Sequence, residues 1–182
     1  DTYHVPVSET AYAPETLEVR LGLYDYATGD RMALATGDDA GVLGEVALHE
    51  QPGADVPNPV SIDFGGEMRL AGYEISPRTA RPGESVSVVL YWQGQQPVTR
   101  DFTVSVQVLG QQDQHNVGQE DSQPAGGALP TSGWEPGVLV GDASTVEIAA
   151  DAPPGVYDVQ IVVYWFDEAG QIQRLERLGA HG

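Results

Sequence analysis

The chain has 182 residues, 41% of them hydrophobic, which is enough apolar material to pack a core and excludes a globally disordered chain. Its 27 acidic and 8 basic residues give a formal net charge of −19. A surface of that charge repels phosphate backbones and anionic headgroups, so we expect no nucleic-acid binding and no direct lipid binding. The absence of cysteine excludes disulfides and thiol catalysis, and no apolar run approaches the roughly 18 residues of a membrane span.

The first predicted element is a partial repeat of the end of the chain. The order Asp, strand, Pro, strand, Tyr and Gly turn over residues 1–29 recurs over residues 142–170, with one residue inserted. Self-similarity of this kind is typical of tandem copies of one structural unit, although sandwich strand pairs also resemble one another by chance. Residues 1–50 are therefore predicted to be the terminal strands of a partial sandwich repeat. Because two or three strands cannot cover their own apolar face, they should pack against the complete unit or against another chain by strand exchange.

The rest of the chain is predicted to be a linker followed by one complete β-sandwich. Residues 51–59 are rich in Pro and Gly and form the linker, and residues 60–182 form the sandwich. Helical periodicity is nearly absent, whereas apolar and polar residues alternate between Pro/Gly turns, as in half-buried antiparallel strands. The apolar residues of these alternating runs are Val86, Val88, Leu90, Trp92, Phe102, Val104, Val106, Val108, Tyr157, Val159, Ile161, Val163 and Trp165. The pattern predicts an all-β fold, an immunoglobulin- or fibronectin-like antiparallel β-sandwich.

The stretch 118–137 is predicted to be a long loop, and it supplies the candidate ligand-binding residues. Loops of this length inside compact domains are usually structured or functional. In the functional interpretation Trp134 is a sugar platform, with Gln123, Asp121 and Thr131 as hydrogen-bonding neighbours. In the structural interpretation, which we favour, Trp134 folds over the open end of the sandwich and caps its core.

The sequence lacks the motifs of the common catalytic sites. The four histidines stand far apart, there is no Gly-x-Ser-x-Gly elbow, and the Gly-Gly pairs lack the lysine of a phosphate-binding loop. We therefore predict no catalytic residue and no cofactor. Calcium is the one ion left open, because the carboxylates at 38–39 and 120–121 lie in or beside predicted turns, but no Asp-x-Asp-x-Asp run fixes a site.

Several segments together resemble a known bacterial domain. They are residues 23–31, 70–77, 81–84, 90–92, 124–137 and 152–157, of which the Gly-Gly to Trp134 segment is the most specific. Together they are similar to the C-terminal extracytoplasmic β-sandwich domains of bacterial multi-spanning membrane proteins of the protein-mannosyltransferase-like glycosyltransferase type. The resemblance implies location and architecture, and it carries over no catalytic residue because the transferase chemistry of that family resides in its membrane portion.

The sequence therefore predicts a non-catalytic accessory domain outside the membrane that spaces or docks a membrane-attached, glycosyltransferase-like protein. Its partner would be the membrane-embedded enzyme portion of its own protein or a cell-surface glycan, and strand-mediated self-association is left open. The alternatives are a carbohydrate-binding module that uses the Trp134 loop and, more weakly, a free-standing enzyme. Because the chain begins with Asp1, we expect it to be a fragment or a processed product.

Overall fold

A computed structural model describes residues 2–7, 11, 13–49 and 55–178 of the chain. The chain divides into two compact units, Asp1–Gly53 (unit 1) and Ala54–Gly182 (unit 2). The described residues form antiparallel strands and two short 3₁₀ turns, with no α-helix, which confirms the predicted all-β class. Within this part of the chain there is no helix of the length and hydrophobicity that a bilayer crossing requires.

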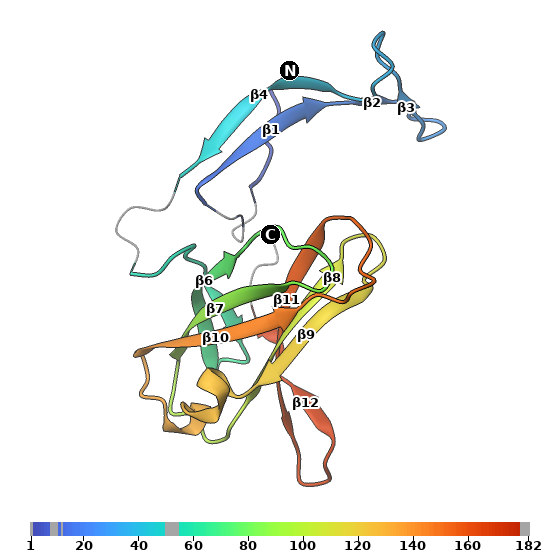
Figure 1. The fold of residues 1–182 in the computed structure, drawn as a ribbon. Helices are drawn as coiled ribbons and strands as arrows, with labels where there is room; N and C mark the ends of the chain where they lie inside the picture. The colour runs from blue at the N-terminus through green and yellow to red at the C-terminus, as the bar shows by residue number, and fades with distance from the viewer. Residues whose placement is uncertain (1, 8–10, 12, 50–54, 179–182) are drawn as a thin grey trace. The chain divides into compact units, whose positions relative to one another are not determined.

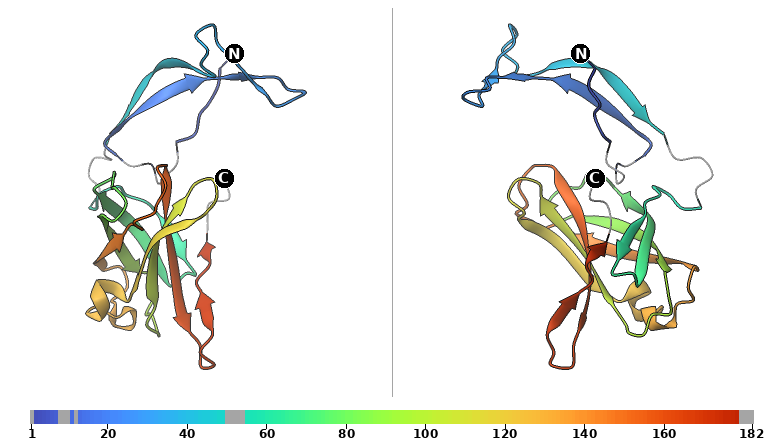
Figure 2. Two further views of the ribbon diagram at one scale, coloured as in Figure 1. Left: turned by 45° about the vertical axis from the view of Figure 1, so that its right-hand side comes forward. Right: turned by 180° about the vertical axis from the view of Figure 1, so that it is seen from behind.

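Unit 2 consists of two antiparallel sheets that pack against each other, an arrangement consistent with a β-sandwich (Figures 1 and 2). The first sheet has the spatial order β10 (Leu139–Glu147), β7 (Ser85–Gly94), β6 (Met68–Ser76), β5 (Ile62–Phe64) and β13 (Arg177–Leu178). The second has the order β12 (Ile172–Arg174), β11 (Tyr157–Phe166), β8 (Thr103–Gly110) and β9 (Asn116–Ser122). Strands in which apolar and polar residues alternate fit such a structure, because one face of each strand is covered and the other face is exposed to water.

The core lies between the two sheets and contains most of the residues that the alternation predicts. Strand β7 buries every second side chain, ending with Trp92, whose ring meets the edge of Phe64 with the centroids 5.4 Å apart. The apolar side chains that are at most 2% exposed are Met68, Val88, Leu90, Trp92, Phe102, Val104, Val106, Val117, Val146 and Val163. Trp92 is therefore a core residue, as its place in the alternating run predicts.

Strand β11 is less buried than the sequence predicts. Only Val163, which pairs with Val104 of β8, is fully covered, whereas Val159 and Ile161 are half-buried. Trp165 is also half-buried. Its ring meets Phe102 edge-on with the centroids 5.6 Å apart, and the Arg100 guanidinium lies 4.9 Å from its centroid. A ring held between an apolar and a cationic neighbour can stay partly wet without loss of packing.

The last residues of the predicted linker are fixed to β6. The amide of Tyr73 donates to the carbonyl of Pro57 over 3.1 Å, and Asn58 Nδ2 donates to the carbonyl of Tyr73 over 3.0 Å. Strand β6 bulges between Leu70 and Gly72, and a Cβ at Gly72 would stand 2.5 Å from the Pro57 carbonyl oxygen. Glycine is therefore required where this segment crosses the strand. Residues 51–54 of the predicted linker lie outside the described residues.

Unit 1 is built from paired strands with a tight turn. Strand β1 (Glu15–Leu21) pairs antiparallel with β4 (Gly41–Leu48), and β2 (Leu23–Tyr24) pairs with β3 (Arg31–Met32). Between β2 and β3 the Asp25 carbonyl accepts the Gly29 amide over 2.8 Å, and Asp25 Oδ1 accepts the Ala27 amide over 2.7 Å.

The turn between β11 and β12 in unit 2 has the same plan. The Asp167 carbonyl accepts the Gly170 amide over 2.9 Å, and Asp167 Oδ1 accepts the Ala169 amide over 3.0 Å. The glycines have φ values of 76° in unit 1 and 74° in unit 2, in the left-handed region that favours glycine. An Asp that accepts from the amide two residues on and a left-handed Gly are thus common to both turns.

Candidate functional site

The connection that holds the candidate residues is shorter than predicted. The loop expected over 118–137 begins only at Gln123, because residues 118–122 belong to β9, which pairs with β8. This part of the prediction is wrong for a physical reason: β9 is an edge strand of its sheet and, of its seven residues, only Val117 is buried, so its sequence carries no alternation. The connection contains two short turns: η1 (Pro124–Gly127), in which Ala125 and Gly126 have left-handed φ values of 53° and 62°, and η2 (Thr131–Gly133), a single 3₁₀ turn.

The Trp134 side chain lies buried just after η2. Its indole is 7% exposed, and its Nε1–H donates to the carbonyl of Leu129 over 3.0 Å. It lies against Gly94 of β7, where an added Cβ would stand 3.8 Å from the Trp134 Cβ. A sugar platform needs an open ring face, and this ring is turned into unit 2. This burial agrees with the structural interpretation, in which Trp134 caps the core. Sugar binding at Trp134 stays a prediction.

Thr131 links the connection between β9 and β10 to the start of β8 through hydrogen bonds. The side chain is 0% exposed; its Oγ1 accepts the amide of Phe102 over 2.9 Å and donates to the carbonyl of Arg100 over 2.8 Å. Next to it, Asp101 Oδ1 accepts the Ser132 amide over 3.0 Å. Hydrogen bonds from Ser132, the side chain first and then the amide, lower the pKa of Asp101. The polar groups of η2 are thus engaged with the segment before β8.

The other two candidate residues lie on the surface. Gln123 is exposed at the end of β9, and Asp121 is exposed on that strand, where its Oδ2 accepts Gln119 Nε2 over 2.6 Å. The structure thus brings Trp134 and Thr131 together in the interior and leaves Gln123 and Asp121 outside. The four residues do not form one open surface.

Asp142 is a buried carboxylate that the sequence interpretation did not single out. It lies in β10 and is 1% exposed, and its Oδ1 accepts the amide of Ala125 in η1 over 2.9 Å. Ala125 has φ 53°, so this hydrogen bond holds a non-glycine residue in the left-handed region. The sequence does contain a signal for its burial: Asp142 lies two positions before Ser144 and four before Val146, so the three side chains share one face of β10. All three are buried.

Burial sets the ionisation of Asp142. Desolvation raises its pKa above the ordinary value of 3.8, opposed by the Ala125 amide and by the indole N–H of Trp92. Neither Asp142 Oδ2 nor Trp92 Nε1 has a partner at hydrogen-bonding geometry. Among the described side chains these are the two buried polar atoms without a hydrogen-bond partner. A carboxyl in such a place favours its neutral form.

Because folding raises the pKa of Asp142, its effect on stability has a definite sign. Above the ordinary value near 3.8 and below the raised pKa, the folded chain holds a proton that the unfolded chain has released, so rising pH favours unfolding. We expect the free energy of unfolding of the native chain to fall relative to Asp142→Asn across this window, and the difference to be constant above it. Thermal unfolding of both proteins between pH 3 and 8 measures this difference. A difference that grows in favour of the native chain with rising pH would show that the carboxylate is the stabilised form.

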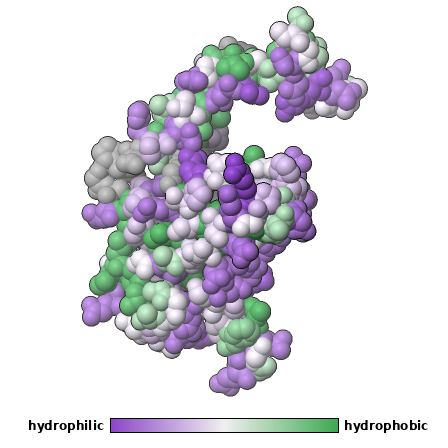
Figure 3. All heavy atoms as spheres, viewed as in Figure 1, coloured by the Kyte–Doolittle hydropathy of each residue, from purple (hydrophilic) through white to green (hydrophobic). Residues whose placement is uncertain are grey.

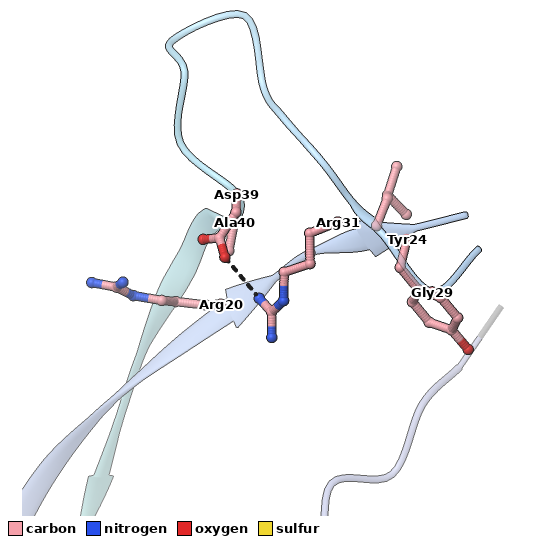
Figure 4. Close-up of a pocket in the computed structure, with 8 residues that line it drawn as sticks. Arg20, Tyr24, Gly29, Arg31, Asp39 and Ala40 are labelled. Carbon is pink, nitrogen blue, oxygen red and sulfur yellow. Dashed lines mark hydrogen bonds and ion pairs between the residues drawn. The ribbon is translucent and has the colours of Figure 1, made fainter. Parts of the chain in front are cut away.

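Unit 1 contains an open hollow of about 500 Å³ beside the β2–β3 turn. Its lining residues are Arg20, Gly22, Leu23, Tyr24, Gly29, Arg31, Asp39 and Ala40. Arg31 pairs with Asp39 over 3.2 Å, and Arg20 pairs with Glu18. Figure 4 shows the Arg20 guanidinium pointing away from the Arg31–Asp39 pair. The two cationic groups are thus each neutralised by an acidic neighbour, and they do not converge on one point.

The carboxylates considered for calcium do not converge either. Asp39 faces Arg31, and Asp38 Oδ2 accepts the Thr36 hydroxyl over 2.9 Å. Glu120 and Asp121 are successive residues of β9, so their side chains point to opposite faces of the strand. In the described ranges, no group of three or more His, Asp or Glu side chains could hold a metal ion.

No protein-family model, curated protein or solved structure matches this chain.

Proposed function

We propose that the chain is a non-catalytic accessory module outside the membrane, which spaces or docks a membrane-attached, glycosyltransferase-like protein. The observation that carries the proposal is the Asp turn shared by Asp25 and Asp167, with its left-handed glycine. It supports the interpretation that unit 1 is the terminal hairpin of a sandwich related to unit 2. Tandem β-sandwiches outside a membrane are suited to spacing and docking because each unit adds length and surface without needing a site of its own.

The finer fold belongs to the same proposal. The apolar residues Leu17, Val19 and Leu21 of β1 follow the same alternation as Tyr157, Val159 and Ile161 of β11. Both strands lead into the shared turn, and the turn of unit 1 is one residue longer. An immunoglobulin- or fibronectin-like sandwich, preceded by the terminal strands of a related repeat, accounts for both features.

A carbohydrate-binding module is the second candidate, and the β9–β10 connection is where it would bind. The hydroxyl of Thr131 is already bonded on both its donor and its acceptor side, and Trp134 is buried, whereas a sugar platform needs an open ring face and free polar neighbours. This is why we rank glycan binding below a spacing or docking role. A free-standing enzyme remains the weakest alternative.

The location tests the proposal directly. In cells that express the full-length gene product, an antibody against this chain should detect it in the membrane fraction. Protease added to intact spheroplasts should remove the epitope, because the module faces outward. A cytoplasmic protein in the same cells serves as the control and should survive. An epitope that stays protected, or that fractionates with the soluble cytoplasm, would contradict the proposal.

A further inference from the structure

The β11–β12 hairpin of unit 2 carries two aromatic side chains on the outer face of its sheet. Val163 of β11 is buried in the core, so Tyr164 and Phe166, which lie on the other face of the strand, point away from the core. Tyr164 is half-buried and Phe166 is 60% exposed. The hairpin extends beyond the rest of its sheet (Figure 1), and Figure 3 shows hydrophobic residues at its surface.

The two rings and the facing residues of β12 form one small surface. The rings meet edge-on, with their centroids 5.8 Å and their planes 82° apart. An edge-on pair leaves ring faces open that a stacked pair would cover. Arg174 stands directly opposite Tyr164, and Ile172 stands directly opposite Phe166. We call Tyr164, Phe166, Ile172 and Arg174 the aromatic corner.

Hydrogen-bonding groups flank the aromatic corner on both sides. The Arg174 side chain is exposed and makes no hydrogen bond or ion pair with another described residue, so its fork of N–H donors is free. On the other side, burial first and the charge of Asp121 second raise the pKa of Tyr164, against a hydrogen bond from Thr103. Asp121 is therefore within electrostatic reach of the ring. It is exposed, and beyond the bond from Gln119 its carboxylate has lone pairs to offer.

We propose that the aromatic corner binds a neutral sugar ring of a glycan, with Tyr164 or Phe166 against the apolar face of the sugar and with Arg174 and Asp121 bonded to its hydroxyl groups. A pyranose ring presents C–H groups on its faces and hydroxyls, which both donate and accept, around its edge. Open aromatic faces between a set of donors and an acceptor match that chemistry. The inference rests on the docking role proposed above and names what is docked. The site is separate from the β9–β10 connection, where Trp134 is buried.

The sheet beside the aromatic corner offers further contacts to a longer glycan. Gln160, Gln107 and Gln119 stand in one row across β11, β8 and β9, on the same outer face as Tyr164. Neighbouring strands are about 4.8 Å apart, so the row presents an amide at each such step. An amide both donates and accepts, as the hydroxyls of a sugar do. An oligosaccharide should therefore bind more tightly than a single sugar.

Charge disfavours other occupants of the aromatic corner. Asp167 and Glu168 follow Phe166 directly, and Asp121 lies on the other side. A second copy of the chain would bring its own three carboxylates to the same place, between two chains that each carry a net charge of −19. An acidic glycan meets the same carboxylates, with Arg174 as its one cation in the aromatic corner. A neutral ligand avoids both costs.

Magnetic resonance of the isotopically labelled full chain tests the ligand class. The probes are neutral oligosaccharides of mannose, glucose, galactose and N-acetylglucosamine, with an oligogalacturonate as the acidic comparison. At least one neutral probe should shift the amide resonances of residues 164–166 and 172–174, with Kd at or below about 1 mM. The proposal is wrong if no neutral probe shifts these resonances at about 10 mM, or if only the acidic one does. Shifts of the same residues with protein concentration alone would assign the surface to a second copy and would also overturn it.

Substitutions at exposed positions test the site. Phe166→Ala and Arg174→Gln should each weaken binding of that probe about 10-fold, because one removes a ring contact and the other the donor fork. Tyr26→Ala, which removes a 93% exposed ring from the turn of unit 1, is the matched control and should change Kd less than about twofold. Unchanged thermal unfolding confirms that all three variants fold. If Phe166→Ala and Arg174→Gln bind no more weakly than the control, the assignment fails. Protease protection in spheroplasts reports location alone, so the proposed function and this site can fail separately.

Discussion

Replacing Trp134 with alanine is expected to lower the free energy of unfolding of unit 2 by about 3–5 kcal/mol. Trp134 is 7% exposed and alanine keeps only its Cβ, so removal of the buried indole leaves a cavity under the β9–β10 connection. Its loss also leaves the Leu129 carbonyl without the indole donor. Urea denaturation followed by circular dichroism measures the change.

Two comparisons make the Trp134 result decisive. Trp134→Phe keeps most of the packing and removes the indole N–H, so we expect it to cost less than half as much as the alanine variant. A glycan array on the native chain and on Trp134→Ala tests the alternative function. If the alanine variant were as stable as the native chain but had lost a glycan signal that the native chain gives, Trp134 would be a binding platform and the structural role would be wrong.

Thr131→Val is expected to destabilise unit 2 by roughly 2–5 kcal/mol although it preserves the size of the side chain. The hydroxyl accepts from the amide of Phe102 and donates to the carbonyl of Arg100, and valine satisfies neither. Each buried group left without a partner costs about 1–3 kcal/mol, because the protein cannot replace the hydrogen bond that water offers the unfolded chain.

The matched control is Thr131→Ser, which keeps both hydrogen bonds and loses only the methyl group. It should cost about 1 kcal/mol, and chemical denaturation of the two variants separates the polar term from the packing term. If serine and valine were equally destabilising, packing of the methyl group would be the main contribution, and the role of Thr131 as a connector of η2 to β8 would be contradicted.

Alternation was enough to predict strands β7, β8 and β11. The run that ends at Trp92 was predicted correctly because each inward position is apolar and each is covered. Strand β9 was missed because an edge strand with one buried residue, Val117, does not need alternation. The anchoring of Asn58 to β6 could not be predicted, since it depends on a bulge and on the close approach at Gly72, which are tertiary features.

The candidate site was likewise predictable from the sequence only in part. Trp134 stood out in the sequence because it is a lone aromatic residue in a Pro/Gly-rich stretch, but composition cannot say whether such a ring points outward or inward. Thr131 was selected as a surface hydrogen-bonding neighbour, whereas its partners at Arg100 and Phe102 lie about thirty residues earlier in the chain and only the fold brings them to it. Asp142 was overlooked because a carboxylate in a strand reads as an exposed residue unless the phase of the strand is followed.

The exposed apolar side chains of β1 and β4 in unit 1 affect how unfolding measurements on this protein should be interpreted. Heat-capacity changes and denaturant slopes report the surface that becomes exposed on unfolding. Leu21 and Val46 are already about half exposed in the folded chain, so unfolding of β1 and β4 adds little to either quantity. A value divided by all 182 residues would therefore understate how tightly unit 2 is packed, and the residues of unit 2 are the better basis for comparison with other β-domains.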